Sequence, residues 1–186
     1  AINTDAQALY HNAAPTKINI GKATTKGLGA GSNPDLGKKS AEESSEEIKS
    51  ALDGADMVFI CCGMGGGTGT GAAPIVARAA KEQGILTVAV TTRPFFFEGQ
   101  QRQKISLSGI KELEKEVDAI ITVPNDRLLS ITDEDTTFDN AFAMSDEVLR
   151  QAVEGISDLI TTPGKINVDF ADIKAVMSDA GSALMG

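Results

Sequence analysis

Three apolar runs, separated by helical patterns, constrain the fold of this chain most. Runs this long and continuous are typical of strands buried on both faces, as in a parallel sheet. Amphipathic stretches, typical of helices, lie between the runs at 73–84 and 100–117. The alternation predicts an α/β fold in which helices cover a parallel sheet. The three runs are DMVFICC (56–62), ILTVAVT (85–91) and AIITVP (119–124).

Helical patterns also flank these runs. An acidic stretch at 40–55 is expected to form one helix that ends at Gly54. Apolar residues at three- and four-residue spacing predict a long helix over 138–160. A chain of 186 residues is long enough for one α/β domain with a sizeable core. Because its first residue is Ala1 and it stops straight after a helical stretch, we expect a piece of a longer protein.

Composition excludes several classes of partner. The chain carries 17 Lys and Arg against 26 Asp and Glu, a net charge of −9, and it has no long basic stretch. We therefore expect no nucleic-acid partner and no anionic membrane surface as the main partner. No run of about 18 apolar residues is present, so direct membrane insertion is not expected. Cys61 and Cys62 are adjacent, which predicts two buried free thiols and no disulfide.

Glycine is concentrated where the first apolar run ends. Six glycines and two threonines occupy the nine positions of 63–71, and a helix is expected from about Ala72, with Pro74 at its start. In parallel α/β sheets, ligands bind beyond the carboxyl ends of strands, where a helix N-terminus offers free N–H groups. Glycine lets a backbone approach a phosphate without a Cβ in the way. The segment therefore predicts a phosphate cradle, to which Thr68 and Thr70 add hydroxyl groups.

Two other phosphate motifs fit this segment less well. The Walker loop needs a lysine before its Ser or Thr, and no lysine follows the glycines until Lys81. A loose dinucleotide pattern fits Gly67, Gly69 and Ala72, which leaves a dinucleotide-binding oxidoreductase as an alternative. That class needs an acidic ribose partner after the second strand, but Thr, Thr and Arg stand at 91–93.

Six motifs, in the same order along the chain, resemble the bacterial cell-division branch of the tubulin/FtsZ family. The resemblance implies a Rossmann-like GTPase domain over 1–136, a long central helix over 137–162, and the start of a C-terminal part over 163–186. It also implies that the family's first glycine-rich loop and first strand are missing from this chain. The motifs are NTDAQAL (3–9), KGLGAGSNP (26–34), GGGTGTG (65–71), FEGQQR (97–102), VPND (123–126) and NVDFADI (167–173).

The resemblance implies GTP as the substrate and GDP as the product. Ala30 and Gly31 match a loop that senses the γ-phosphate, although these residues alone would equally predict a turn. Glu98 and Arg102 match contacts to the ribose and phosphates, although at four-residue spacing they would equally form a surface ion pair. The phosphate loop of the family falls on Gly65, Gly66, Gly67, Thr68, Gly69, Thr70 and Gly71.

A guanine reader is expected on the long helix. Phe142 and Asp146 are four residues apart and share a helix face, so they offer an aromatic plane and a carboxylate side by side. A carboxylate can accept hydrogen bonds from the ring N–H and the exocyclic amine of guanine together, whereas adenine has no such pair of donors. For Phe142, plain core packing is the alternative.

Catalysis is expected from a second subunit. By resemblance, Asn167, Asp169 and Asp172 belong to the synergy loop, which enters the nucleotide pocket of the next subunit and orients the attacking water. Read without the family, Asp169 and Asp172 would cap a helix. A non-hydrolysing homologue would have lost these carboxylates, but both are present. The resemblance further implies head-to-tail filaments, division-ring partners, Mg²⁺ with the nucleotide and a cytoplasmic location at the division site.

Overall fold

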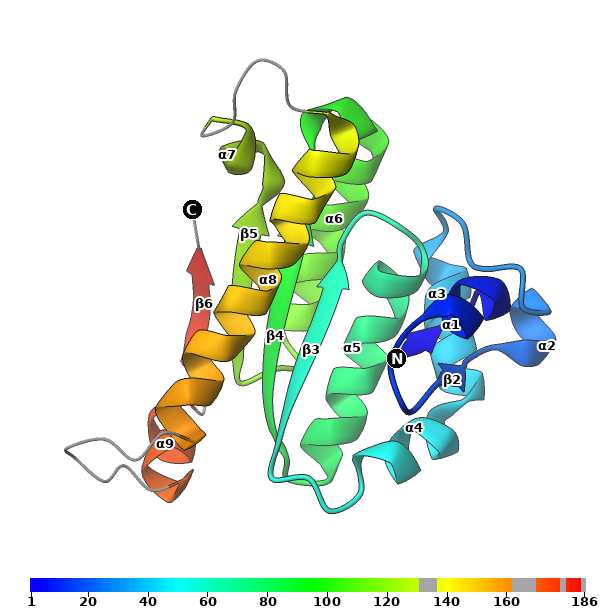
Figure 1. Ribbon diagram of the computed structural model, residues 1–186. Helices are drawn as coiled ribbons and strands as arrows, with labels where there is room; N and C mark the ends of the chain where they lie inside the picture. Colours follow the sequence, from blue (N-terminus) through cyan, green and yellow to red (C-terminus); the bar gives the residue numbers. More distant parts are fainter. Residues whose placement is uncertain (131–136, 162–169, 178–179, 185–186) are drawn as a thin grey trace.

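The main sheet has four parallel strands in the order β3-β4-β5-β6. The computed structural model describes residues 1–130, 137–161, 170–177 and 180–184. The α/β class and the three predicted strands are confirmed, and β6 is a further edge strand that no sequence pattern indicated. All four strands point the same way in Figure 1. The strands are β3 (Met57–Gly63), β4 (Leu86–Arg93), β5 (Ala119–Pro124) and β6 (Gly181–Leu184).

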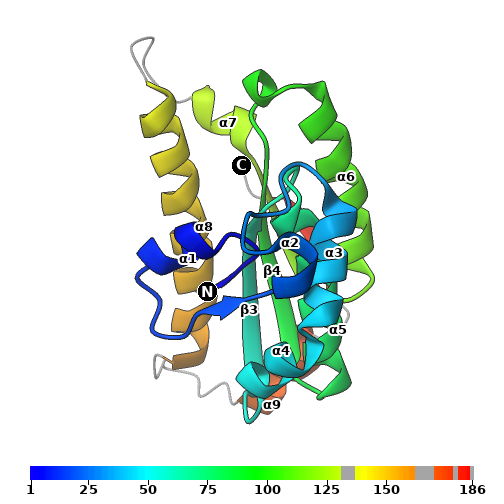
Figure 2. The same ribbon diagram turned by 90° about the vertical axis from the view of Figure 1, so that its right-hand side faces the viewer.

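Helices cover both faces of this sheet (Figure 2). On one face lie α5 (Thr68–Glu82) and α6 (Gln100–Glu114), and α3 (Pro34–Glu43) packs against α5. The other face carries α8 (Phe138–Thr161), which confirms the predicted long helix. Between the layers, β4 is buried from Leu86 to Thr92. Its continuous burial explains why the sequence of this strand is apolar on both faces.

The N-terminal segment, called the N-terminal unit below, forms a small second sheet whose Ile18 and Ile20 pack into the main hydrophobic core. Here β1 (Ile2–Asn3) pairs in parallel with β2 (Ile18–Asn19), flanked by α1 (Ala6–His11) and α2 (Lys22–Thr25). Neither short strand pairs with β3, which is an edge strand among the described residues. The prediction that both thiols are buried is therefore wrong for Cys61, which is exposed, while Cys62 is half-buried. Burial nevertheless raises the pKa of both thiols, that of Cys62 to about 12.

The prediction of a single acidic helix over 40–55 is wrong, because the chain bends at Ser44 between α3 and α4 (Ser45–Leu52). The side chains of Glu43 and Ser44 at the bend form hydrogen bonds with the N-terminal unit. Ser44 Oγ accepts a hydrogen bond from the backbone N–H of Gly21 at 3.1 Å. The Glu43 carboxylate accepts hydrogen bonds from the backbone N–H groups of Ala23 and Thr24 at 2.8 and 3.0 Å. These hydrogen bonds lower the pKa of the Glu43 carboxyl, and the bond from Ala23 has the largest effect.

Three shorter elements complete the described chain: η1 (Phe96–Glu98), α7 (Asn125–Leu129) and α9 (Phe170–Met177). In Figure 1, η1 and α7 follow the carboxyl ends of β4 and β5, while α9 lies at the opposite end of the molecule. Among the described helices, none combines the length and apolar character that a membrane span requires.

Candidate functional site

The glycine-rich segment joins the carboxyl end of β3 to the N-terminus of α5, as predicted. The helix begins at Thr68, however, and not near Ala72, so the prediction of a loop over 63–71 is wrong in its second half. Pro74 lies inside the helix and not at its start. Because proline has no N–H, it cannot donate to the carbonyl of Thr70 one turn earlier, so that helical bond is missing. The first turn of α5 consists of Gly and Thr residues, because the helix begins at Thr68. The N–H groups of this turn are directed toward the loop.

Both threonines of the loop are engaged inside the protein. Thr70 is buried, and its Oγ1 accepts a hydrogen bond from the backbone N–H of Gly65 at 2.9 Å. This bond closes the loop on itself and holds Gly65 at a φ of +110°, a value that favours glycine. Thr68 Oγ1 lies 2.6 Å from Thr4 Oγ1 in the N-terminal unit. Thr70 thus fixes the shape of the loop, while Thr68 ties it to the segment that follows β1.

Packing requires glycine at several positions of the loop, as Gly67 and Gly71 illustrate. The backbone N–H of Gly67 donates to the carbonyl of Gly31 at 2.8 Å, which places the predicted γ-phosphate-sensing segment directly against the loop. A Cβ on Gly67 would lie 2.6 Å from that same carbonyl oxygen, and one on Gly71 would lie 2.0 Å from the carbonyl oxygen of Pro34. In contrast, a Cβ on Gly66 would meet nothing within 4 Å. Gly66 is therefore the loop glycine that faces open space.

The start of α3 extends this backbone-to-backbone packing. Asn33 caps the helix by accepting hydrogen bonds from the N–H groups of Asp35 and Leu36 at 3.0 and 3.4 Å. One turn later, a Cβ on Gly37 would lie only 2.1 Å from the carbonyl oxygen of Gly67. Segment 26–33, α3 and the loop therefore form one closely packed body. No sequence pattern singled out Gly37, because nothing local marks a contact with a residue thirty positions away.

Glu98 and Arg102 form an ion pair beside the loop. Arg102 Nη1 donates to Glu98 Oε2 at 2.6 Å, and Glu98 Oε1 accepts a hydrogen bond from the N–H of Phe95 at 2.9 Å. The main chain of Arg102 lies against the loop, since a Cβ on Gly65 would lie 2.9 Å from the Arg102 carbonyl oxygen. The surface-ion-pair interpretation thus describes the pair itself. Its position next to Gly65 is what the nucleotide interpretation requires.

On α8, Phe142 is packed on one side and open on the other. Its ring meets that of Phe95 edge-on, with centroids 5.3 Å apart, yet 43% of its surface remains exposed. Asp146 lies one turn further along the helix and is exposed. Between them, Ser145 Oγ donates to Asn125 Oδ1 at 2.9 Å in a buried contact that fixes α8 against α7. A contact series therefore runs from Phe142 through Phe95 and the ion pair to Gly65, and the sequence had not indicated the part that Phe95 plays.

Of the predicted catalytic residues, the structure describes Asp172 alone, and it does not join this group within one chain. Asn167 and Asp169 lie outside the described residues. Asp172 lies in the first turn of α9, at the opposite end of the molecule from η1 and α7 (Figure 1). Two residues on, Lys174 Nζ donates to the carbonyl of Gly84 at 2.9 Å, just past the C-terminal end of α5. The loop lies at the N-terminal end of α5, and a helix of this length spans roughly 20 Å.

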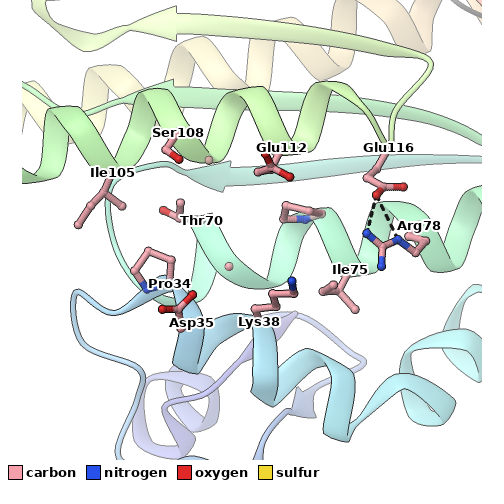
Figure 3. A pocket seen from close by; sticks show the side chains of 13 residues that line it. Pro34, Asp35, Lys38, Thr70, Ile75, Arg78, Ile105, Ser108, Glu112 and Glu116 are labelled. Atoms are coloured by element: carbon pink, nitrogen blue, oxygen red, sulfur yellow. Dashed lines mark hydrogen bonds and ion pairs between the residues drawn. The ribbon is translucent and has the colours of Figure 1, made fainter.

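A cavity of about 370 Å³ lies between α3, α5 and α6 (Figure 3). Thr70 contributes to its wall from the loop, and Arg78 and Glu116 form an ion pair of 2.6 Å at one end. None of Gly65, Gly66, Glu98, Phe142 and Asp146 lines this cavity. Of the predicted nucleotide-binding residues, only Thr70 and Gly71 line this cavity. In the described part of the chain, no group of three or more His, Cys, Asp and Glu side chains is arranged to hold a metal.

Comparison with known proteins agrees with this geometry. The model of the Tubulin/FtsZ family GTPase domain matches residues 1–133. The structure of an empty FtsZ dimer from M. jannaschii is 52% identical, with a TM-score of 0.93, and the match covers 98% of this chain and 53% of that one. A mutant FtsZ from the same organism gives 52% identity and a TM-score of 0.94 over 99% of this chain and 55% of that one. A GTPγS-bound protofilament of CetZ2 from Haloferax volcanii is 25% identical, with a TM-score of 0.80. That match covers 99% of this chain and 54% of the CetZ2 chain.

The chain thus spans about half the length of the solved structures that it matches. The family match covers more than half of this chain, and the two FtsZ structures match nearly all of it at 52% identity. Strands β3, β4 and β5, with the glycine-rich junction between β3 and α5, lie within the residues that the family model matches. The chain belongs to the tubulin/FtsZ family and carries its GTPase domain.

Proposed function

We propose that the protein of which this chain is part binds and hydrolyses GTP and assembles head to tail into filaments of the division ring. One observation carries the proposal. Residues from four separate segments meet at the carboxyl end of the parallel sheet, beside the free N–H groups of α5. They come from the loop at 65–71, the segment at 26–33, the ion pair Glu98–Arg102 and the ring of Phe142. This end of a sheet is where α/β proteins bind nucleotides.

The contacts of the site support a role for each segment. Gly66 faces open space, so its backbone can lie against the phosphates, and the N-terminus of α5 stabilises their negative charge. Gly31 is bonded to Gly67, which supports the proposal that Ala30 and Gly31 sense the γ-phosphate. The exposed face of Phe142 would stack on the guanine, with Asp146 accepting its N–H groups. Mg²⁺ would come bound to the triphosphate and neutralise part of its charge, and we assign it no protein ligand.

Hydrolysis requires a second subunit in this proposal. Asp172 lies at the far end of the molecule from the loop, so the synergy-loop residues Asn167, Asp169 and Asp172 would act on the nucleotide of the next subunit. There the carboxylates would orient a water molecule. Its oxygen would attack the γ-phosphorus, while the bond between that phosphorus and the bridging oxygen, which leaves with GDP, breaks. Such catalysis depends mainly on positioning and charge stabilisation, which a neighbour can supply.

A head-to-tail contact need not close on itself and can therefore build a filament. We further propose that loss of the γ-phosphate weakens this contact. The filament would form in the cytoplasm at the division site, together with other division-ring proteins, as the sequence resemblance to bacterial division proteins implies.

Mixing two inactive variants of the full-length protein tests whether two subunits share one GTPase site. Asp172→Ala would keep the nucleotide pocket and lose the catalytic end. Gly66→Asp would place a negative charge against the phosphates at a position where a side chain meets nothing within 4 Å, so it would lose GTP and keep the catalytic end. Each full-length variant alone should be nearly inactive. An equal mixture should recover roughly a quarter of the wild-type turnover, because one heterologous interface in four then pairs an intact pocket with an intact catalytic end.

The matched control for this experiment is Asp158→Ala, which removes an exposed carboxylate from α8 and should leave turnover unchanged. Substantial turnover by Asp172→Ala alone would contradict the assignment. So would a mixture that co-assembles and stays inactive.

A further inference from the structure

Two arginines share a pocket at the carboxyl ends of β4 and β5. Arg93 is the last residue of β4, and Arg127 lies in α7, which directly follows β5. The strand register sets Arg93 opposite Pro124, so the two arginines are brought together by the pairing of neighbouring strands. The pocket has a volume of about 230 Å³ and is lined by Arg93, Pro94, Gln103, Pro124, Asp126 and Arg127.

The other polar groups of this pocket already have partners. Asp126 Oδ1 accepts a hydrogen bond from the N–H of Phe96 at 2.7 Å. Gln103 Nε2 donates to the carbonyl of Pro94 at 2.7 Å. Asp126 supplies one negative charge against the two positive charges of the arginines. The lining therefore keeps a net positive charge, in a chain whose overall charge is −9.

Arg93 carries an unsatisfied donor. Its Nε is buried and has no hydrogen-bond partner. A buried donor without a partner is unfavourable, and native proteins normally satisfy such groups with protein, water or a ligand. Among the described residues, none provides an acceptor for this Nε.

The other three arginines of the chain differ from these two. Arg78, Arg102 and Arg150 each form an ion pair with a glutamate, at 2.6 Å in every case. Within the residues that the structure describes, Arg93 and Arg127 form no such pair. The two arginines that lack a carboxylate partner among the described residues are thus the two that line one pocket.

We propose that Arg93 and Arg127 form a binding site for an oxyanion, a phosphate or a carboxylate. The guanidinium group presents a planar fork of N–H donors that matches two oxygens of such an anion. None of the residues at 65–71, Glu98, Arg102, Phe142 or Asp146 lines this pocket, and Pro94 of its lining lies beside Gly65, so the site adjoins the nucleotide surface without sharing its predicted residues. Two sources could supply the oxygens: free inorganic phosphate, or a carboxylate of a second copy of the chain. The proposal does not depend on hydrolysis of GTP.

Calorimetric titration of the full-length protein with inorganic phosphate tests the site. Saturating GDP is present, and the protein stays below the concentration at which it assembles. We expect Arg127→Gln and Arg93→Met each to weaken phosphate binding at least tenfold. Lys111→Gln removes the same charge from an exposed position on α6 and should leave binding unchanged. Arg127 is exposed, so its replacement should fold normally.

Thermal unfolding provides a second readout. A ligand that binds only the folded state raises the melting temperature. Phosphate should therefore raise the Tm of the wild type and of Lys111→Gln, but not that of Arg93→Met. In the absence of phosphate, Arg93→Met should melt at or above the wild-type temperature, because it removes the buried unsatisfied donor.

Sedimentation distinguishes the two sources. If a carboxylate of a second copy fills the site, phosphate should inhibit assembly, and Arg127→Gln should raise the concentration needed for assembly. If the natural ligand is the free anion, assembly should be unchanged while phosphate binding is lost. Absence of phosphate binding to the wild type overturns the proposal. So does phosphate binding that persists in both arginine variants, since it would then belong to another site such as the glycine-rich loop.

Discussion

Replacing Gly37 by alanine should destabilise the protein, although the same change in an ordinary helix stabilises it. An added Cβ at this position would lie 2.1 Å from the carbonyl oxygen of Gly67, where ordinary contact begins at 3.4 Å. The contact is with backbone, so α3 must move by about 1 Å. Such overpacking costs up to about 3 kcal/mol. Alanine returns about 1 kcal/mol through its higher helix propensity. The net loss of about 2 kcal/mol should lower the Tm by roughly 4–8 °C.

Gly155→Ala is the matched control. Gly155 also lies inside a helix, α8, but an added Cβ there would meet nothing within 4 Å. This variant should gain about 0.5–1 kcal/mol and melt slightly above the wild type. Scanning calorimetry of both variants measures the difference. Gly37→Ala should also bind GTP more weakly, because the shift of α3 displaces Gly67. If the two variants raise the Tm equally, the inferred packing between α3 and the loop is wrong.

Three further predictions concern single functional groups. Asp169→Ala and Asp172→Ala in the full-length protein should abolish GTP turnover and keep GTP binding by filter assay; equal loss of both would contradict catalysis in trans. Asp146→Ala should reduce the preference for GTP over ATP by about 10–100-fold, because hydrogen bonds to a charged group contribute about 1.5–3 kcal/mol, and an unchanged preference in competition binding would place the guanine reader elsewhere. Cys61 should be alkylated before Cys62 in this chain, since Cys61 is exposed and the pKa of Cys62 is raised to about 12. A raised thiol pKa leaves less thiolate at neutral pH, so both rates should climb as the pH is increased above 8, and peptide mapping that finds Cys62 modified first would contradict the burial described.

The strands and the long helix were predictable because their signals are local. β3, β4 and β5 are continuous apolar runs, and α8 repeats its apolar residues along one face. The two-residue strands β1 and β2 are too short to leave a pattern. The bend at Ser44 could not be predicted, since it depends on hydrogen bonds from Gly21 and from α2, more than eighteen residues away.

The candidate site was predictable to the extent that its residues form motifs. The loop at 65–71 and the pair Glu98–Arg102 were recognised, and the structure sets them side by side. The inward role of Thr70 was missed, because it depends on a bond that the loop makes to itself. The pairing of Arg93 with Arg127 was missed as well. It follows from strand register, which a sequence pattern does not reveal.

GTP turnover by the full-length protein, followed over a range of protein concentrations with light scattering alongside, tests the shared site most directly. Because the loop and Asp172 lie at opposite ends of one subunit, activity should require contact between subunits. The proposal predicts that turnover per molecule rises from near zero above a critical concentration, together with scattering. Turnover per molecule that is constant at all concentrations, without scattering, would mean that one subunit hydrolyses GTP alone, and it would contradict the account.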